Sequence, residues 1–119
     1  MKRVIIKPNK AIILESEGPL DLEELKELIG AEYIDIIIRR IGGVEYHIVV
    51  DDMGALKPNV AVAQAIDGAE TLYGPIIVTR YEYEGAEVGL EDIDIINVSA
   101  HIFQDAEAAF LIYAWNANF

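Results

Sequence analysis

Apolar and polar residues alternate along residues 33–52, YIDIIIRRIGGVEYHIVVDD, and this alternation predicts a β-hairpin at the centre of the fold. A two-residue loop at Gly42 and Gly43 would place Ile38 opposite His47 and Ile37 opposite Ile48, which mixes the two faces of the hairpin. A three-residue loop at residues 41–43 gathers one apolar row on a single, core-facing side, so we predict that register. It pairs Ile38 with Tyr46, Ile36 with Ile48, Ile34 with Val50 and, beside the loop, Arg40 with Val44.

The segment PLDLEELKELIG carries the clearest helix signal in the chain. Asp21 suits the N-cap, Glu24 stands where a capping box needs it, and Gly30 suits the C-terminal stop. One helical face is apolar and consists of Leu22, Leu25, Leu28 and Ile29. The pattern predicts a helix over residues 22–29 that packs on the apolar face of the hairpin.

Weaker patterns complete the chain. They predict a first hairpin from residues 4–7 and 11–15, a helix over 60–66, a strand over 76–84 and helices over 91–101 and 106–114. The order β-β-α-β-β-α-β-α indicates an α+β fold, an antiparallel or mixed sheet with helices packed on one face, in a single domain over residues 1–119. Aromatic residues near the C-terminus either complete the core or form a partner surface: Phe110, Tyr113, Trp115 and Phe119.

The formal net charge is −12, and residues 81–119 carry −8 of it, with eight acidic and no basic residues. Binding to duplex nucleic acid is disfavoured, because phosphate contacts need clustered lysine and arginine. The acidity serves solubility or presents a surface to a basic partner. The chain has no cysteine and no apolar run long enough for a signal peptide or a membrane span, so we expect a cytoplasmic protein.

No residue pattern indicates a catalytic, metal or cofactor site, so we expect a protein that is not an enzyme. We interpret His47 as a partly buried structural histidine rather than a general base. Asp51 and Asp52 suit a turn better than a cation site. Asp92 and Asp94 are interpreted as part of a solvated face.

Binding remains as the function class. Nine residues are suited to holding a small anionic or nucleotide-like ligand, because aromatic rings stack on bases and arginine forks hold phosphates. These candidates are Tyr33, Arg39, Tyr46, His47, Lys57, Asn59, Tyr73, Arg80 and Tyr81. Each one taken singly is better explained as core or surface filler, and only convergence in one pocket would give the set a function.

Three stretches carry a resemblance to a known family: LDLEELKELIGAEYIDII, HIVVDDMGALKPNVAVA and LYGPIIVTR. Their hydrophobic pattern, D-x-x-G turn and Pro-Asn-x-x-Ala segment resemble a small α+β domain family of phages, plasmids and other mobile elements. The resemblance covers residues 3–80, and residues 85–119 depart from it. It implies a mobile-element origin and no established activity.

Two functions are compatible with these observations. The first is a non-enzymatic anti-defence protein that sequesters a nucleotide-type ligand, which follows from the resemblance and from the lack of catalytic motifs. The alternative is an acidic protein inhibitor or DNA mimic that binds a basic host protein through the acidic residues of 81–119. Self-association is expected under either function, because exposed edge strands need cover.

Overall fold

A computed structural model describes residues 1–7, 10–53, 61–63, 72–83 and 85–102 of the chain. The elements are β1 (Lys2–Lys7), β2 (Lys10–Glu15), α1 (Leu22–Ile29), β3 (Ile34–Ile41), β4 (Val44–Asp51), β5 (Ala61–Ala63), β6 (Leu72–Tyr73), β7 (Ile76–Thr79) and α2 (Asp92–Ile102). Five strands form one antiparallel sheet in the order β2-β1-β7-β4-β3, and β5 pairs with β6. The α+β class is confirmed, and the main sheet is antiparallel rather than mixed.

The central strand of the sheet is β7, which pairs with β1 on one side and with β4 on the other. All four of its residues, IIVT, are buried. A short strand that is buried on both faces belongs inside a sheet. The prediction that the β3–β4 hairpin forms the centre of the fold is therefore wrong, because β3 is an edge strand.

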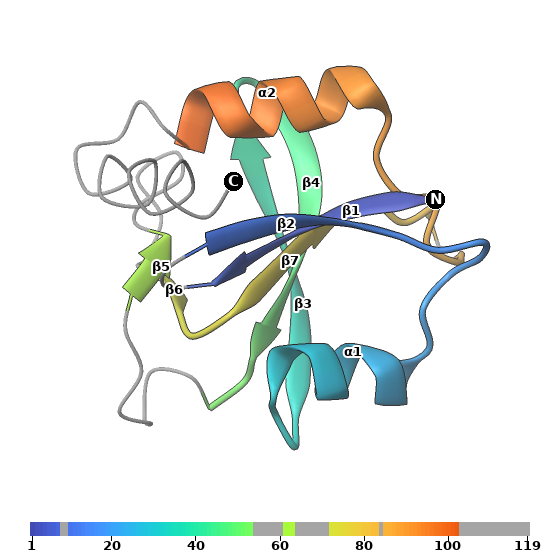
Figure 1. Cartoon of the computed structure of the whole chain (residues 1–119), viewed down its shortest axis with the longest axis vertical. Helices are drawn as coiled ribbons and strands as arrows, with labels where there is room; N and C mark the ends of the chain where they lie inside the picture. Colours follow the sequence, from blue (N-terminus) through green and yellow to red (C-terminus); the bar gives the residue numbers. More distant parts are fainter. Residues whose placement is uncertain (8–9, 54–60, 64–71, 84, 103–119) are drawn as a thin grey trace.

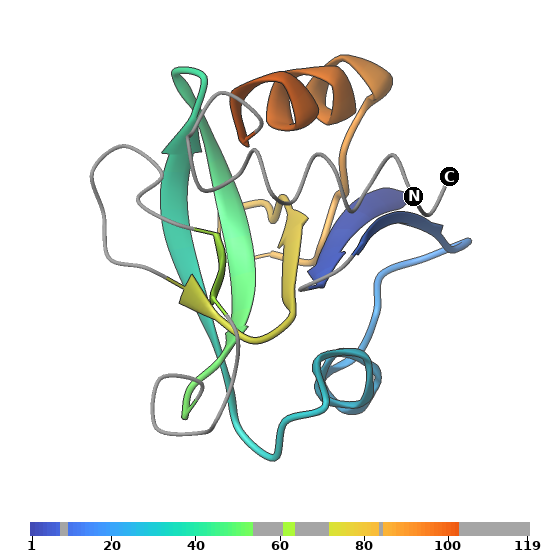
Figure 2. The same cartoon turned by 60° about the vertical axis from the view of Figure 1, so that its left-hand side comes forward.

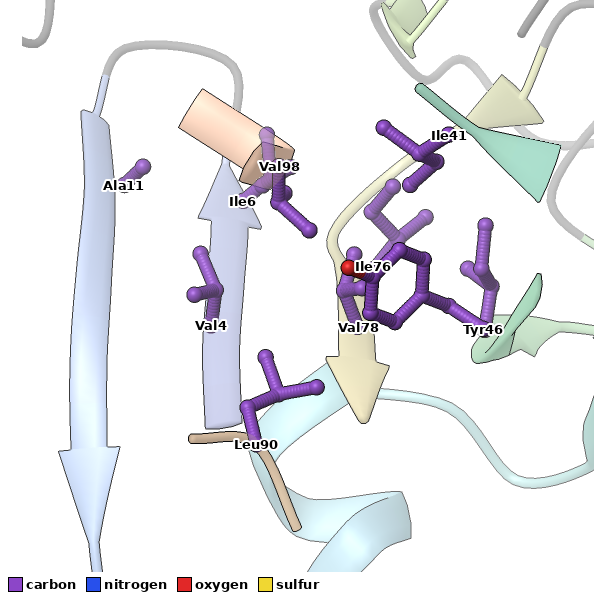
Figure 3. Close-up of a cluster of buried hydrophobic side chains, with 10 residues drawn as sticks. Val4, Ile6, Ala11, Ile41, Tyr46, Ile76, Val78, Leu90 and Val98 are labelled. Carbon is purple, nitrogen blue, oxygen red and sulfur yellow. The ribbon is translucent and has the colours of Figure 1, made fainter. Parts of the chain in front are cut away.

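The two helices cover opposite faces of the sheet, α2 on one and α1 on the other (Figure 1). On the α2 face, Val98 packs with a core that includes Val4 and Val78, and Figure 3 shows this cluster. On the α1 face, the core is built from Ile5, Leu25, Ile29, Val49 and Ile77. The predicted packing of the helices on one face is wrong, because the inner strands carry apolar residues on both faces and both need cover.

The β3–β4 register differs by one residue from the prediction. Gly42 and Gly43 form a two-residue turn with φ of 58° and 80°, as a type I′ turn requires, and Ile41 pairs with Val44. Ile41 is thereby buried in the sheet, with 2% exposed, instead of lying in the loop. Ile36 and Ile38 face away from the row of Tyr46 and remain 42% and 54% exposed, which an edge strand allows.

Replacing Gly42 with alanine is expected to lower the free energy of unfolding more than replacing Gly43. Both glycines have positive φ, which costs an alanine roughly 1–2 kcal/mol. A Cβ at Gly42 would also overlap the side chains of Asn97 and His101 on α2, whereas a Cβ at Gly43 meets open space. Hydrogen bonds from Asn97 to the Ile41 carbonyl and the Tyr46 hydroxyl hold its side chain in place, so the overlap should add to the loss. Chemical denaturation of the two variants measures the difference, and equal losses would contradict the packing of α2 on this turn.

Several local predictions are confirmed. β1 and β2 form the first hairpin, and α1 has the capping box between Asp21 and Glu24 and a left-handed Gly30 with φ of 75°. α2 corresponds to the predicted helix over 91–101.

Other expected elements differ or lie outside the described residues. The helix predicted over 60–66 is wrong where the structure describes it, because Ala61–Ala63 is a strand paired with β6. The strand predicted over 76–84 ends at Thr79. The helix over 106–114 and the C-terminal aromatic residues lie outside the described residues. Within the described ranges, no helix has the length and apolar character needed to cross a membrane.

Candidate functional site

The nine predicted ligand-binding residues do not meet in one pocket within the described part of the chain. Tyr46 and Arg80 lie together on the α2 face, and Arg39 pairs across the strands with Tyr46. His47 and Tyr81 contact each other on the α1 face. Tyr33 is 59% exposed just before β3, and Tyr73 belongs to β6. Lys57 and Asn59 lie outside the described residues.

The polar group on the α2 face, here called the Tyr46 cluster, consists of Tyr46, Arg80, Asp94 and Asn97. The Tyr46 hydroxyl donates to Asp94 Oδ1 at 3.0 Å and accepts from Asn97 Nδ2 at 2.9 Å. Arg80 lies over the Tyr46 ring, 5.8 Å from its centroid, and its Nη1 is 3.3 Å from Asp94 Oδ2. Asn97 also donates to the Ile41 carbonyl at 2.9 Å. These contacts attach α2 to the sheet.

The Tyr46 cluster is structural rather than catalytic in character. Tyr46 is fully buried, and this burial raises the pKa of its hydroxyl above the usual value of 10. A phenol with a raised pKa stays protonated at neutral pH and acts here as a donor to Asp94. Asp94 is itself buried and also accepts from the Glu91 N–H at 3.0 Å, so its predicted place on a solvated face is wrong.

The polar group on the α1 face, here called the Arg3 cluster, consists of Arg3, Ser16, Thr79 and Glu87. Arg3 donates to the Glu87 carboxylate from Nε at 2.7 Å and from Nη2 at 2.8 Å, and both side chains are fully buried. Arg3 Nη2 also donates to Ser16 Oγ at 3.0 Å. Glu87 accepts two further hydrogen bonds, from the Thr79 hydroxyl and from the Leu20 N–H. The cluster thus joins β1, β7 and the segment before α1.

The buried carboxylate of Glu87 remains charged. Burial alone raises the pKa of this group, but the hydrogen bonds from Arg3, Thr79 and the Leu20 N–H outweigh it, so the pKa lies below its usual value of 4.5. Burial also raises the pKa of the neighbouring Tyr81. The Tyr81 hydroxyl is buried without a hydrogen-bond partner among the described residues. An ion pair closed off in this way holds the fold together and is not open to a ligand.

His47 is half-buried beside Tyr81, with ring centroids 5.3 Å apart in an edge-to-face arrangement. Its Nδ1 accepts a hydrogen bond from the Tyr81 N–H at 3.1 Å. The contact agrees with the interpretation of His47 as a structural residue. Asp51 accepts from the Met53 N–H at 2.9 Å, which agrees with the predicted turn.

Exposed acidic side chains gather around α1. Residues 15–32 contain seven acidic residues and one lysine, a net charge of −6, and all seven are exposed: Glu15, Glu17, Asp21, Glu23, Glu24, Glu27 and Glu32. We call this set the α1 acidic surface. Two of the acidic residues that had indicated an acidic surface in 81–119, Glu87 and Asp94, are instead buried and paired.

A groove runs between β2 and α1 within this surface. It has a volume of about 360 Å³ and is lined by Leu14, Leu20 and Leu28 together with Glu15, Glu24 and Glu27. The three leucines are half-buried and pack on the α1-face core. A second hollow of about 430 Å³ along α1 shares Glu27 with this groove and also has Glu23, Lys26 and Glu32 in its lining. The β2–α1 groove combines apolar and anionic groups, which suits a ligand that is apolar and cationic.

Sequence reasoning missed Arg3, Glu87 and the α1 acidic surface as functional or structural groups. Arg3 had one usable signal, because it shares a face with the buried Ile5 in the otherwise apolar strand KRVIIK. Glu87 had no such signal in the sequence, because its partner Arg3 lies 84 positions away in the chain.

Within the residues that the structure describes, no group of three or more histidine, aspartate or glutamate side chains is placed to hold a metal ion. Comparisons of the chain with protein-family models, with curated proteins and with solved structures find no match. The resemblance to a mobile-element family therefore stays a prediction.

Proposed function

We propose that this protein is a binding module that holds a basic, amphipathic segment of a partner protein in the β2–α1 groove. The observation that carries the proposal is the leucine-lined groove bordered by exposed carboxylates, within a segment of net charge −6. This is the acidic-inhibitor alternative, with the binding surface moved from residues 81–119 to residues 15–32.

The physical argument has two parts. Carboxylates on the rim raise the association rate of a cationic partner and select against acidic ones. Leu14, Leu20 and Leu28 offer apolar area, which supplies affinity that exposed charges alone do not.

β2 adds a third feature to this site. It is the edge strand next to the groove, and none of the described residues pairs with its outer side. An extended segment of the partner could add to this edge by backbone hydrogen bonds while its side chains reach the groove.

The test compares two variants of equal net charge. Glu15→Lys with Glu27→Lys reverses two groove carboxylates, and Glu45→Lys with Glu82→Lys reverses two exposed carboxylates that do not line the groove. The probe is a fluorescent peptide of alternating lysine and leucine, titrated by anisotropy. We expect the groove variant to bind about tenfold more weakly than the control variant, and raising the salt to weaken binding to the parent chain.

Equal loss in the two variants would show that only total charge matters and would overturn the proposal. Failure of the parent chain to bind the peptide would overturn it as well. Glu24 is left unchanged in these variants because it belongs to the capping box of α1.

The small-ligand function, the absence of enzymatic activity and the mobile-element origin stay predictions. The candidate residues for a nucleotide are divided between the two faces of the sheet where they are described. Incubation with a panel of nucleotides, followed by heating and analysis of the released material, tests the sequestration function. Recovery of an unaltered nucleotide would support the sequestration function, and recovery of no nucleotide would contradict it.

A further inference from the structure

The outer edge of β3 is an unusual surface for a protein of this charge. β3 is the outermost strand of the sheet on the side away from β1 and β2 (Figure 2), and no described residue pairs with its outer side. It is eight residues long and carries Ile36 and Ile38, which are 42% and 54% exposed. It has one acidic and two basic residues, so the strand carries a net positive charge although the whole chain has a net charge of −12. Long apolar edge strands of this kind tend to pair with another strand.

The hairpin geometry determines which backbone groups of β3 face outward. Ile41 and Val44 flank the two-residue turn and therefore bond each other, and this pattern repeats every second residue. The groups of Ile36 and Ile38 then point away from β4. The side-chain contacts agree, because the Ile36 N–H donates to Asp35 Oδ1 at 2.9 Å and the Ile38 carbonyl accepts from Arg39 Nη1 at 3.1 Å.

We propose that β3 pairs antiparallel with β3 of a second copy, about a twofold axis at Ile37. In this register Ile36 faces Ile38 of the second copy, and their outward backbone groups can exchange hydrogen bonds. The two exposed isoleucines of each chain then cover those of the other. The Ile36 N–H and the Ile38 carbonyl exchange their contacts with Asp35 and Arg39 for backbone hydrogen bonds, and the pairing covers the apolar surface of the edge at the same time.

In this register alone, charged residues of β3 lie opposite residues of the other sign in β3 of the second copy. Asp35 faces Arg39 of the second copy, and the same pair forms again on the other side of the axis. Arg39 Nε, which is buried and has no hydrogen-bond partner within the described ranges, gains a carboxylate nearby. A twofold axis at Ile36 or at Ile38 would set Asp35 opposite an isoleucine, so the pairing of charges selects Ile37.

The resulting dimer has a defined shape. Each copy contributes five strands, so the dimer contains a continuous ten-stranded sheet. Its twofold axis is perpendicular to this sheet, and the α1 faces of the two copies therefore lie on the same side. Both copies of α1 then lie on one face, and the two β2 edges lie at the far ends. The two β2–α1 grooves stay open and point the same way, which would allow bivalent binding.

The experiment is sedimentation equilibrium of the full chain and of variants in β3. The parent chain is expected to sediment as a dimer, at twice its mass of 13.2 kDa. Arg39→Asp sets like charges across the axis and should weaken the dimer at least about tenfold. Adding Asp35→Arg to it restores opposite charges and should restore the dimer.

A second pair of variants keeps the test independent of the charged residues. Ile38→Lys changes an exposed residue at the interface, whereas Ile13→Lys changes an isoleucine that is 44% exposed on the opposite edge strand, β2. We expect only Ile38→Lys to dissociate the dimer. A parent chain that stays at 13.2 kDa at all concentrations, or a dimer that persists in both Arg39→Asp and Ile38→Lys, would overturn the proposal.

Discussion

Replacing Glu87 with alanine is expected to lower the free energy of unfolding by about 3–5 kcal/mol. The change leaves the Arg3 guanidinium fully buried without its counter-charge. It also removes the acceptor of the Thr79 hydroxyl and of the Leu20 N–H. Urea denaturation of the parent and the variant measures the loss.

Two controls separate the buried charge from other effects. Asp92→Ala breaks the neighbouring Lys2–Asp92 pair, which lies in solvent, and should leave stability nearly unchanged. The double variant Arg3→Met with Glu87→Leu removes both charges and should lose less stability than Glu87→Ala. Equal losses for Glu87→Ala and Asp92→Ala would contradict the described role of the Arg3 cluster.

The same carboxylate makes stability depend on pH. The folded state holds the pKa of Glu87 below 4.5, so the unfolded state takes up the proton first as the pH falls. The stabilisation is therefore complete above about pH 4.5 and is lost as the pH drops below that value. The stability difference between the parent and Glu87→Gln should shrink in acid, and a difference that is constant with pH would contradict the assignment.

The second large effect is expected at Tyr46. Tyr46→Phe removes a buried hydroxyl that donates to Asp94 and accepts from Asn97. Leaving those two groups with one partner fewer should cost about 1–3 kcal/mol. Loss of the hydroxyl should also loosen α2, since both partners belong to that helix. Denaturation gives the first quantity, and amide hydrogen exchange in α2 gives the second.

Tyr81→Phe is the matched control. The Tyr81 hydroxyl is also buried, but it has no hydrogen-bond partner among the residues that the structure describes. Its removal should cost little or should stabilise the protein, because an unsatisfied buried polar group is itself unfavourable. A larger loss in Tyr81→Phe than in Tyr46→Phe would contradict the hydrogen bonding of the Tyr46 cluster.

The parts of the fold that could be predicted from the sequence depend on local interactions. The capping box of Asp21 and Glu24 and the left-handed Gly30 act within α1, so that helix was predicted with its correct bounds. The first hairpin likewise depends on neighbouring residues.

The wrong predictions depend on contacts that are distant in sequence. The register of β3 and β4 was chosen as if their hairpin had one buried face, but β7 places β4 inside the sheet and leaves β3 at its edge. Burial of Ile41 and the two positive-φ glycines then favour the shorter turn. The central position of β7 could not be read from its four residues alone.

The candidate site was the least predictable feature. Residue type alone favoured aromatic and arginine side chains as ligand-binding residues. Side chains alternate along β4, however, and this places Tyr46 and His47 on opposite faces of the sheet. The α1 acidic surface was overlooked because total charge per segment favoured residues 81–119, where burial and ion pairing remove Glu87 and Asp94.

The most direct measurement of the central claim is a map of backbone amide shifts of the labelled chain on titration with the lysine–leucine peptide. The proposal of a basic partner in the β2–α1 groove predicts that the largest changes lie in β2 and α1, around Leu14 and Leu28. Changes centred elsewhere in the chain, or no changes at all, would contradict the proposed function.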